Sequence, residues 1–272
     1  MQRIFILVLL VYLFSFSVEA KQITFGIVPQ QSAATLAKKW GPILKFLSQE
    51  TQHDVVFRTA NNIPEFEKRV LEGKYDVAYM NPYHYTVFHQ KPGYEAFAKQ
   101  KNKKIRGILV VKKDSTIDDL KGLAGQTLAF PSPAAFAASV IPRATLTNQT
   151  IPFQPRYVSS HDSVYMNVSK GFMVAGGGIE RTLNNTNEAV RNNLKILWKT
   201  PGYTPHAFAF HPKLAQDIRE KMSMALLKLN DSQEGQALLK KINFKGIEAA
   251  KDQDWDDVRA LNIKLLDHLL KK

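Results

Sequence analysis

Two segments of the chain place hydroxyl and imidazole groups where helices are predicted to begin. Ser132 precedes an alanine-rich segment, and Ser160 and His161 precede a segment with helical spacing of apolar residues. The first N–H groups of a helix have no partner within it and carry partial positive charge, so such a helix start can bind an anion. Ser132 and Ser160 are equally well explained as plain helix caps, and His161 as an exposed loop residue.

Aromatic side chains with polar tips follow one of the predicted strands. Tyr79, Tyr83 and Tyr85 alternate along a segment in which Asn81-Pro82 ends the strand, so all three cannot pack in one core. Such groups suit a site for a small solute. Trp40 lies on the apolar stripe of an earlier helix, where core packing and a place in the site are both open.

The histidines do not predict a metal site. His84 and His89 are five residues apart, as are His206 and His211, which is the wrong spacing for one face of a helix. No acid accompanies either pair, and the chain contains no cysteine. We therefore expect neither a metal ion nor another cofactor.

Catalytic chemistry has little support in the sequence. Ser160, His161 and Asp162 are contiguous, whereas a catalytic triad needs side chains that converge from separate segments. The glycine run 176–178 could approach a phosphate, which makes Gly177 a candidate site residue, but it lacks a recognised nucleotide-binding pattern. A closely packed turn explains the run equally well, and we do not expect an enzyme.

The apolar patterns predict two consecutive α/β units with parallel strands. A strand at 207–210 could rejoin the first unit, and the C-terminal stretch has helical spacing. In the first unit we expect strands at 23–28, 55–57, 75–79 and 108–111, with helices from Ser32 and at 63–72. In the second we expect strands at 127–130, near 157–158 and at 172–175, with helices at 117–120, from Ala134 and at 162–170.

Ligands in open α/β sheets bind beyond the carboxyl ends of the strands, so the loops that follow strands are the candidate site. These loops combine turn residues with helix starts. They are predicted at 29–32, 80–85, 131–135, 159–162 and 176–178.

The N-terminus has the layout of a cleaved secretory signal. Arg3 precedes an apolar run from Ile4 to Val18, and Ala20 offers a small residue at the cut, so the mature chain should start near Lys21. Without cysteine the mature chain has neither disulfides nor a lipid-modified anchor, which points to a bacterial periplasm. The formal net charge of +13 attracts anions, while secretion and the lack of an aromatic-basic motif argue against nucleic acid.

Several segments together resemble a known family. The chain is similar to the substrate-binding proteins of phosphate, phosphite and phosphonate ABC transporters, the phosphonate-binding branch of the type 2 periplasmic binding proteins. The likeness runs over nearly all of the mature chain, in order and at plausible spacing. The segments that carry it are FGIVPQQS at 25–32, YDVAYMNPYHY at 75–85, STIDDLKGLAG at 115–125, SSHDS at 159–163, TPGYTPH at 200–206, which includes Tyr203, and FKG at 244–246.

The resemblance implies an α/β clamshell of two lobes joined by a two-strand hinge, with the ligand in the cleft between them. Lobe 1 would comprise residues 21–112 plus 204–272, and lobe 2 residues 113–203. Tyr85 and His161 would contact the oxygens of the anion, and Trp40 would lie at the cleft. The expected partners are a small anionic solute and an ABC permease with its ATPase, and we expect a monomer.

One departure from the family concerns the turn before the alanine-rich helix. Family members that bind phosphonates tightly have Ser-Thr-Ser there, whereas this chain has Pro133, Ala134 and Ala135, and only Ser132 remains as a hydroxyl donor. Each lost hydrogen bond costs about 1 kcal/mol. No acid occurs between Phe172 and Gly178 to neutralise a ligand ammonium, so an aminoalkyl phosphonate is not the favoured ligand.

Two alternatives to transport remain open at the level of sequence. The same clamshell could report a different small ligand to a membrane kinase or cyclic-nucleotide enzyme. An enzyme of this fold that uses His161 on a small phosphorylated compound is the third hypothesis.

Overall fold

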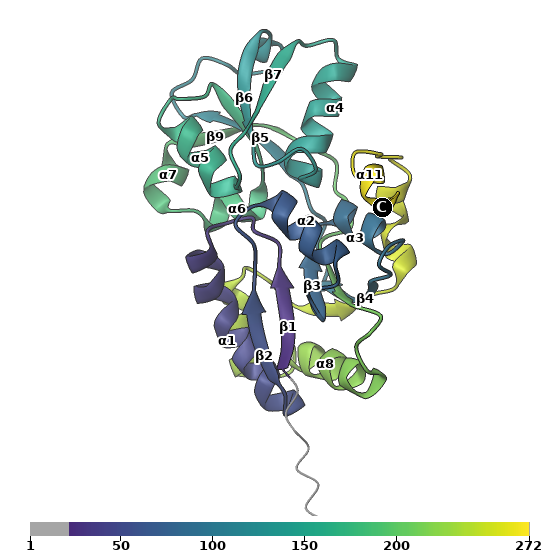
Figure 1. Ribbon diagram of the computed structural model, residues 1–272. Coiled ribbons are helices and arrows are strands. Elements are labelled where there is room, and N and C mark those ends of the chain that lie inside the picture. The colour runs from purple at the N-terminus through teal and green to yellow at the C-terminus, as the bar shows by residue number, and fades with distance from the viewer. Residues whose placement is uncertain (1–21, 272) are drawn as a thin grey trace, which may run out of the picture.

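The computed structural model describes residues 22–271 as a two-lobed α/β protein in which each lobe has its own sheet (Figure 1). The expected signal peptide lies outside the described residues. Within them, no helix combines the length and the apolar character that a membrane span requires. The fold class expected from the sequence is confirmed.

The sheet of lobe 1 is mixed and has six strands in the order β11-β4-β10-β3-β1-β2. β1 pairs in parallel with β2 and β3, and β10 returns from the second lobe to pair antiparallel with β3 and β4. The strand that was expected to rejoin the first unit therefore does so. The strands are β1 Gln22–Ile27, β2 Asp54–Arg58, β3 Val77–Met80, β4 Glu95–Gln100, β10 Ala207–Phe210 and β11 Ile247–Ala249.

Polar caps begin the helices that cover this sheet. Ser32, Asn62 and Asn81 each accept a hydrogen bond from a backbone N–H three residues on, at α1 (Ala33–Thr51), α2 (Ile63–Leu71) and α3 (Pro82–Phe88) respectively. The remaining helices of lobe 1 are α8 Gln216–Lys228, α9 Gln233–Lys241, η3 Asp252–Trp255, α10 Asp256–Arg259 and α11 Asp267–Leu270.

The sheet of lobe 2 has five strands in the order β7-β6-β8-β5-β9. β5 pairs with β8 and β9 in this sheet, so the expectation that residues up to 112 belong to lobe 1 is wrong for this strand. The strands are β5 Gly107–Lys112, β6 Gln126–Phe130, β7 Phe153–Tyr157, β8 Ala175–Ile179 and β9 Leu194–Lys199.

Two predictions for lobe 2 are corrected. The strand expected at 172–175 is β8, which begins where that prediction ends and contains the glycine run 176–178 instead of preceding it. The helix expected at 117–120 is replaced by the short 3₁₀ turn η1 (Lys121–Leu123). The other helices are η2 Phe136–Val140, α4 Ile141–Asn148, α5 His161–Ser169, α6 Glu180–Asn185 and α7 Glu188–Asn192.

Two glycines allow the alanine-rich helix start to lie on the sheet of lobe 2. The π-helical turn η2 runs into α4, and the carbonyl oxygens of Ala137 and Ala138 press against β5 and β8. A Cβ atom on Gly107 would lie 1.8 Å from the first oxygen, and one on Gly177 would lie 1.9 Å from the second. The helix start is thereby fixed at the edge that faces lobe 1, whose core it joins.

Two antiparallel segments connect the lobes. The backbone N–H of Ile105 donates to the carbonyl of Tyr203 at 2.7 Å, and Tyr203 returns the bond at 3.0 Å. Thr200 continues the pairing through a bond to Gly107. This is the two-strand hinge expected from the resemblance.

Candidate functional site

Three small cavities lie along the seam between the lobes. The His161 cavity, of about 10 Å³, is bounded by Gln30 and Asn81 of lobe 1 and by His161 and the start of η2 from lobe 2. The Arg181 cavity and the Lys39 cavity have about 20 Å³ each. Each holds roughly one water molecule, so a phosphonate-sized ligand enters only when the lobes separate or a side chain moves.

Backbone and side-chain hydrogen bonds close this seam. The N–H of His161 donates to the carbonyl of Gln30 at 3.1 Å. The carboxylate of Asp162 accepts from the backbone N–H of Ser32 and from the side chain of Gln31, both at 3.3 Å. The loop after β1 and the start of α5 therefore meet directly.

His161 is buried at the seam and uncharged at neutral pH. Burial, with a smaller contribution from the nearby Arg181 guanidinium, lowers its pKa to about 3. Nδ1 lies 3.2 Å from the hydroxyl of Thr182, which itself lies 2.7 Å from the hydroxyl of Tyr165. The single proton of the Thr182 hydroxyl has two acceptors, the carbonyl of Ile179 at 2.9 Å and Nδ1; when it goes to Nδ1, the ring proton is on Nε2 and His161 can donate to an anion.

His206 and Gln30 extend the polar lining on the side of lobe 1. The amide Nε2 of Gln30 lies 2.8 Å from Nε2 of His206, and both residues bound the His161 cavity. Burial first, then the positive charge of Arg181, holds the pKa of His206 well below its usual value. Both imidazoles at the seam are therefore neutral hydrogen-bonding groups.

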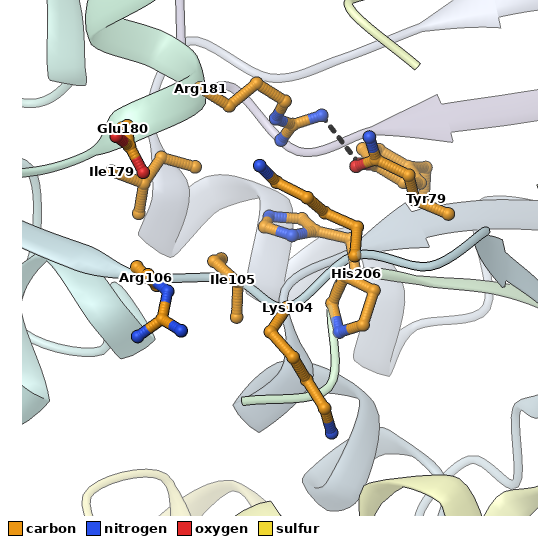
Figure 2. A pocket seen from close by; sticks show the side chains of 11 residues that line it. Tyr79, Lys104, Ile105, Arg106, Ile179, Glu180, Arg181 and His206 are labelled. Carbon is orange, nitrogen blue, oxygen red and sulfur yellow. Dashed lines mark hydrogen bonds between the residues drawn. The ribbon is translucent and has the colours of Figure 1, made fainter. Parts of the chain in front are cut away.

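Arg181 crosses from α6 of lobe 2 to lobe 1 (Figure 2). Its Nη1 donates to the hydroxyl of Tyr79 at 2.7 Å, and its Nη2 donates to Oε1 of Gln30 at 2.6 Å. The guanidinium carbon lies 5.6 Å from the ring centroid of Tyr79 and 5.7 Å from that of Phe244. This side chain occupies the middle of the seam.

The start of the alanine-rich helix forms the wall of the His161 cavity in lobe 2. Ala135 and the first residues of η2 line it, and the carbonyl of Ala134 accepts a long hydrogen bond, 3.5 Å, from Asn81. The hydroxyl of Ser132 is buried and has no hydrogen-bond partner among the described residues. A buried hydroxyl of this kind costs free energy unless it finds a partner.

Two of the predicted tyrosines have partners in lobe 1 away from these cavities. Tyr85 is fully buried, and its hydroxyl donates to Asp252 at 2.7 Å while its ring packs on Trp255. The hydroxyl of Tyr83 accepts from the backbone N–H of Leu266 at 2.8 Å, and burial raises its pKa to about 12. The structure does not bring either hydroxyl to the seam.

The other predicted residues support the site more than they line it. Trp40 is buried beneath Tyr79, with ring centroids 4.9 Å apart, and reaches the Lys39 cavity. Ser160 accepts the N–H of Ser163 as the cap of α5. Gly177 lies within β8 rather than in a turn, and Tyr203 belongs to the hinge, with its ring edge on Phe136.

The residues that sequence reasoning missed are Gln30, Asn81, Arg181 and, as a seam residue, His206. Arg181 follows β8 directly, at the carboxyl end of a strand where ligand-binding residues are expected. The sequence predicts this strand at 172–175, several residues before β8 ends, so it does not identify Arg181 as a residue that follows the strand.

The two histidine pairs do not converge. His84 is hydrogen-bonded to the buried Glu67 at 2.9 Å, and His89 to the carbonyl of Tyr94 at 2.8 Å. Across residues 22–271, no three acidic or histidine side chains are grouped as metal ligands would be.

The two lobes, the crossing hinge and the polar seam define a two-lobed solute-binding protein of the type 2 periplasmic class. The structure is similar to a binding protein component of an ABC phosphonate transporter from Pseudomonas aeruginosa, with 19% identity, a TM-score of 0.83, and coverage of 90% of this chain and 86% of that one. It is similar to PhnD1 from Prochlorococcus marinus in complex with methylphosphonate, with 19% identity, a TM-score of 0.82, and coverage of 90% and 98%.

The sequence comparisons reach the level of family. The family model for the periplasmic phosphonate-binding proteins of ABC transporters matches residues 25–255, so the chain belongs to this family of substrate-binding transporter components. A phosphate-import protein from Mycolicibacterium smegmatis, PhnD, is 21% identical over 232 residues, which cover 74% of this chain and 69% of that protein. The family places the protein in the periplasm, with an ABC permease and ATPase as partners.

Proposed function

We propose that this chain binds a phosphate- or phosphonate-type oxyanion in the His161 cavity and delivers it to the permease. One observation carries the proposal: neutral hydrogen-bonding groups from both lobes, Gln30 and Asn81 on one side and His161 on the other, line the same cavity as a helix start. The names of the similar proteins, which refer to phosphonate and phosphate, agree with this ligand class.

The chemistry of the cavity suits an oxyanion despite the replaced Ser-Thr-Ser turn. Neutral amide, imidazole and backbone N–H groups hold an anion without the desolvation of a second charge. Ser132, whose buried hydroxyl has no partner in the described part of the chain, precedes this helix start but does not line the cavity itself. We propose that the amide, imidazole and backbone N–H groups replace the hydroxyls that Ala134 and Ala135 lack.

Ligand binding in this proposal works through closure of the lobes. The solute enters when the seam opens, and contacts from both lobes then favour the closed form, which the permease recognises. The groups act by hydrogen bonding alone, so the protein releases its ligand unchanged and has no catalytic step.

We further propose the organisation in which this function operates. Lobe 1 comprises about residues 22–104 and 204–272, and lobe 2 about 105–203, because β5 pairs within the second sheet. The sequence features that support a periplasmic protein free of a lipid anchor are the secretory-type N-terminus and the lack of a cysteine to carry a lipid.

The test is thermal unfolding of the purified protein with methylphosphonate, phosphate and, as a comparison anion, chloride. A ligand at a hundredfold excess over its dissociation constant adds about 2.7 kcal/mol to the free energy of unfolding. We expect methylphosphonate or phosphate to raise the melting temperature and chloride to leave it unchanged. In His161→Leu the shift should disappear, whereas the exposed His268→Leu should retain it. No shift with either oxyanion contradicts the proposal.

A further inference from the structure

We propose that Arg181 selects ligands that carry a second anionic group beside the phosphonate, of which a phosphonocarboxylate is the simplest kind. This inference rests on the proposed function and specifies its ligand class. The juxtaposition that carries it is a guanidinium with neutral partners that lines two of the three seam cavities and is bonded to Gln30, which lines the third.

The hydrogen bonds of Arg181 leave it suited to an incoming anion. Its two side-chain acceptors, the Tyr79 hydroxyl and the Gln30 amide oxygen, are both neutral. A guanidinium has five N–H donors in a planar fork that matches a carboxylate with two parallel bonds. The present bonds are charge-assisted by the donor alone, whereas a carboxylate adds the opposite charge and accepts two parallel bonds, so it is the stronger acceptor for this guanidinium.

Neighbouring cavities share lining residues. Gln30 borders both the His161 cavity and the Lys39 cavity, while Tyr79 and Arg181 border both the Lys39 cavity and the Arg181 cavity. A phosphonate in the His161 cavity therefore directs its substituent past Gln30 toward the guanidinium. A substituent that passes Gln30 meets Arg181, because Nη2 of Arg181 lies 2.6 Å from Oε1 of Gln30.

The surroundings of Arg181 are basic, and the nearby cations also have neutral acceptors. Lys39 donates to the carbonyl of Asn185 at 3.4 Å, and Arg106 donates to the carbonyl of Thr200 at 3.3 Å. Burial lowers the pKa of Lys39; the charge of nearby Asp162 opposes this effect and that of Arg181 adds to it. An additional anionic group relieves this excess of positive charge.

The carboxylates beside the seam are already engaged. Glu180, which borders the Arg181 cavity, holds the ammonium of Lys199 at 2.9 Å, and in Figure 2 its side chain lies apart from that of Arg181. Asp162 accepts from Gln31 and Ser32 across the seam. A ligand ammonium would meet Arg181 instead of an acid, so the same arrangement disfavours aminoalkyl phosphonates.

The experiment compares three ligands that differ only in the substituent of the phosphonate. Isothermal titration of the purified protein with methylphosphonate, phosphonoacetate and 2-aminoethylphosphonate measures their dissociation constants at one pH and salt concentration. We expect phosphonoacetate to bind at least about tenfold tighter than methylphosphonate, and 2-aminoethylphosphonate to bind more weakly than either.

Two variants assign the preference to Arg181. Arg181→Gln should reduce the ratio between phosphonoacetate and methylphosphonate to about one while methylphosphonate still binds. Arg191→Gln removes the same charge from α7, outside the three cavities, and should keep the wild-type ratio. Circular dichroism and the melting temperature establish that both variants fold.

The outcomes separate this inference from the function on which it rests. Equal affinities of the wild-type protein for methylphosphonate and phosphonoacetate, or an undiminished preference in Arg181→Gln, overturn the inference alone. Absence of binding by all three phosphonates overturns the inference, and absence of binding by phosphate as well overturns the proposed function with it.

Discussion

A methyl group on Gly177 would lie 1.9 Å from the carbonyl oxygen of Ala138 and 2.7 Å from the ring of Phe130. Gly177→Ala must therefore push the start of the alanine-rich helix away from β8. We expect a loss of about 1–3 kcal/mol in the free energy of unfolding and a weaker affinity for the oxyanion, measured by denaturant unfolding and titration.

Gly41 provides the matched control for that substitution. It lies inside α1, and a Cβ atom there meets nothing within 4 Å apart from its chain neighbours. Gly41→Ala should change the free energy of unfolding by less than about 1 kcal/mol without a change in affinity, because the helix preference of alanine is offset by the following Pro42. Equal stabilities of the two variants would contradict the close approach at Gly177.

The buried histidines predict a loss of stability on acidification. The pKa of His161 falls from its ordinary value near 6.5 to about 3 on folding, mainly through burial, and that of His206 also falls. Below pH 6.5 the unfolded chain binds protons that the folded protein excludes. His161 should therefore lower the free energy of unfolding by up to about 1.4 kcal/mol per pH unit as the pH falls from 6.5 toward 3, and His206 should act in the same direction below pH 6.5.

Denaturant unfolding at pH 7.5, 6.5, 5.5 and 4.5 measures this dependence. His161→Gln should flatten the slope, whereas the exposed His268→Gln should leave it as in the wild type. An unchanged slope in His161→Gln would mean that this residue titrates normally in the folded protein.

Thr182 sets the tautomer of His161 if the imidazole donates to the ligand. Thr182→Val removes the hydroxyl that lies 3.2 Å from Nδ1, while Tyr165 retains the carbonyl of Ile179 as an acceptor. We expect affinity for methylphosphonate to weaken about fivefold, since one hydrogen bond contributes about 1 kcal/mol. Thr182→Ser should restore most of the affinity, and an equally weak serine variant would exclude the role of the hydroxyl.

Tyr85 offers a direct test of the contact that the family resemblance implies. Its hydroxyl donates to Asp252 in lobe 1, so Tyr85→Phe should lower the free energy of unfolding by about 1–3 kcal/mol and leave affinity unchanged. Parallel titration and denaturant unfolding distinguish the two effects. A clear loss of affinity with little loss of stability would support the contact with the anion instead.

The sequence predicts many of the strands and helices because they are strongly patterned, although it assigns β5 to the wrong lobe. Apolar runs at β1 and β3 and the caps at Ser32 and Ser160 are local signals, and the structure confirms the elements that they delimit. The predicted position of β8 is wrong because glycine has a low strand propensity, so the glycine run 176–178 has the pattern of a turn. The glycines belong to the strand because a helix carbonyl lies against them, which is a tertiary requirement.

The sequence predicts the candidate site less completely because several of its residues are positioned by contacts between segments that are distant in the sequence. Asn81 and Pro82 were read as the end of a strand, but they are also the cap and first residue of α3, which turns Tyr85 toward Trp255. His161 was found through its position at a helix start. Arg181 required the correct end of β8, and its crossing to Tyr79 is visible only when both lobes are in place.

The paired segments around Ile105 and Tyr203 limit how the two lobes can move. Within residues 22–271 two covalent connections join the lobes, and their reciprocal backbone bonds restrict a separation of the lobes to a rotation about an axis near this pair. The distance opened at the seam therefore grows with distance from that axis. Substitutions in the paired segments should alter how fast solute enters and leaves, even when every group that touches the solute is intact.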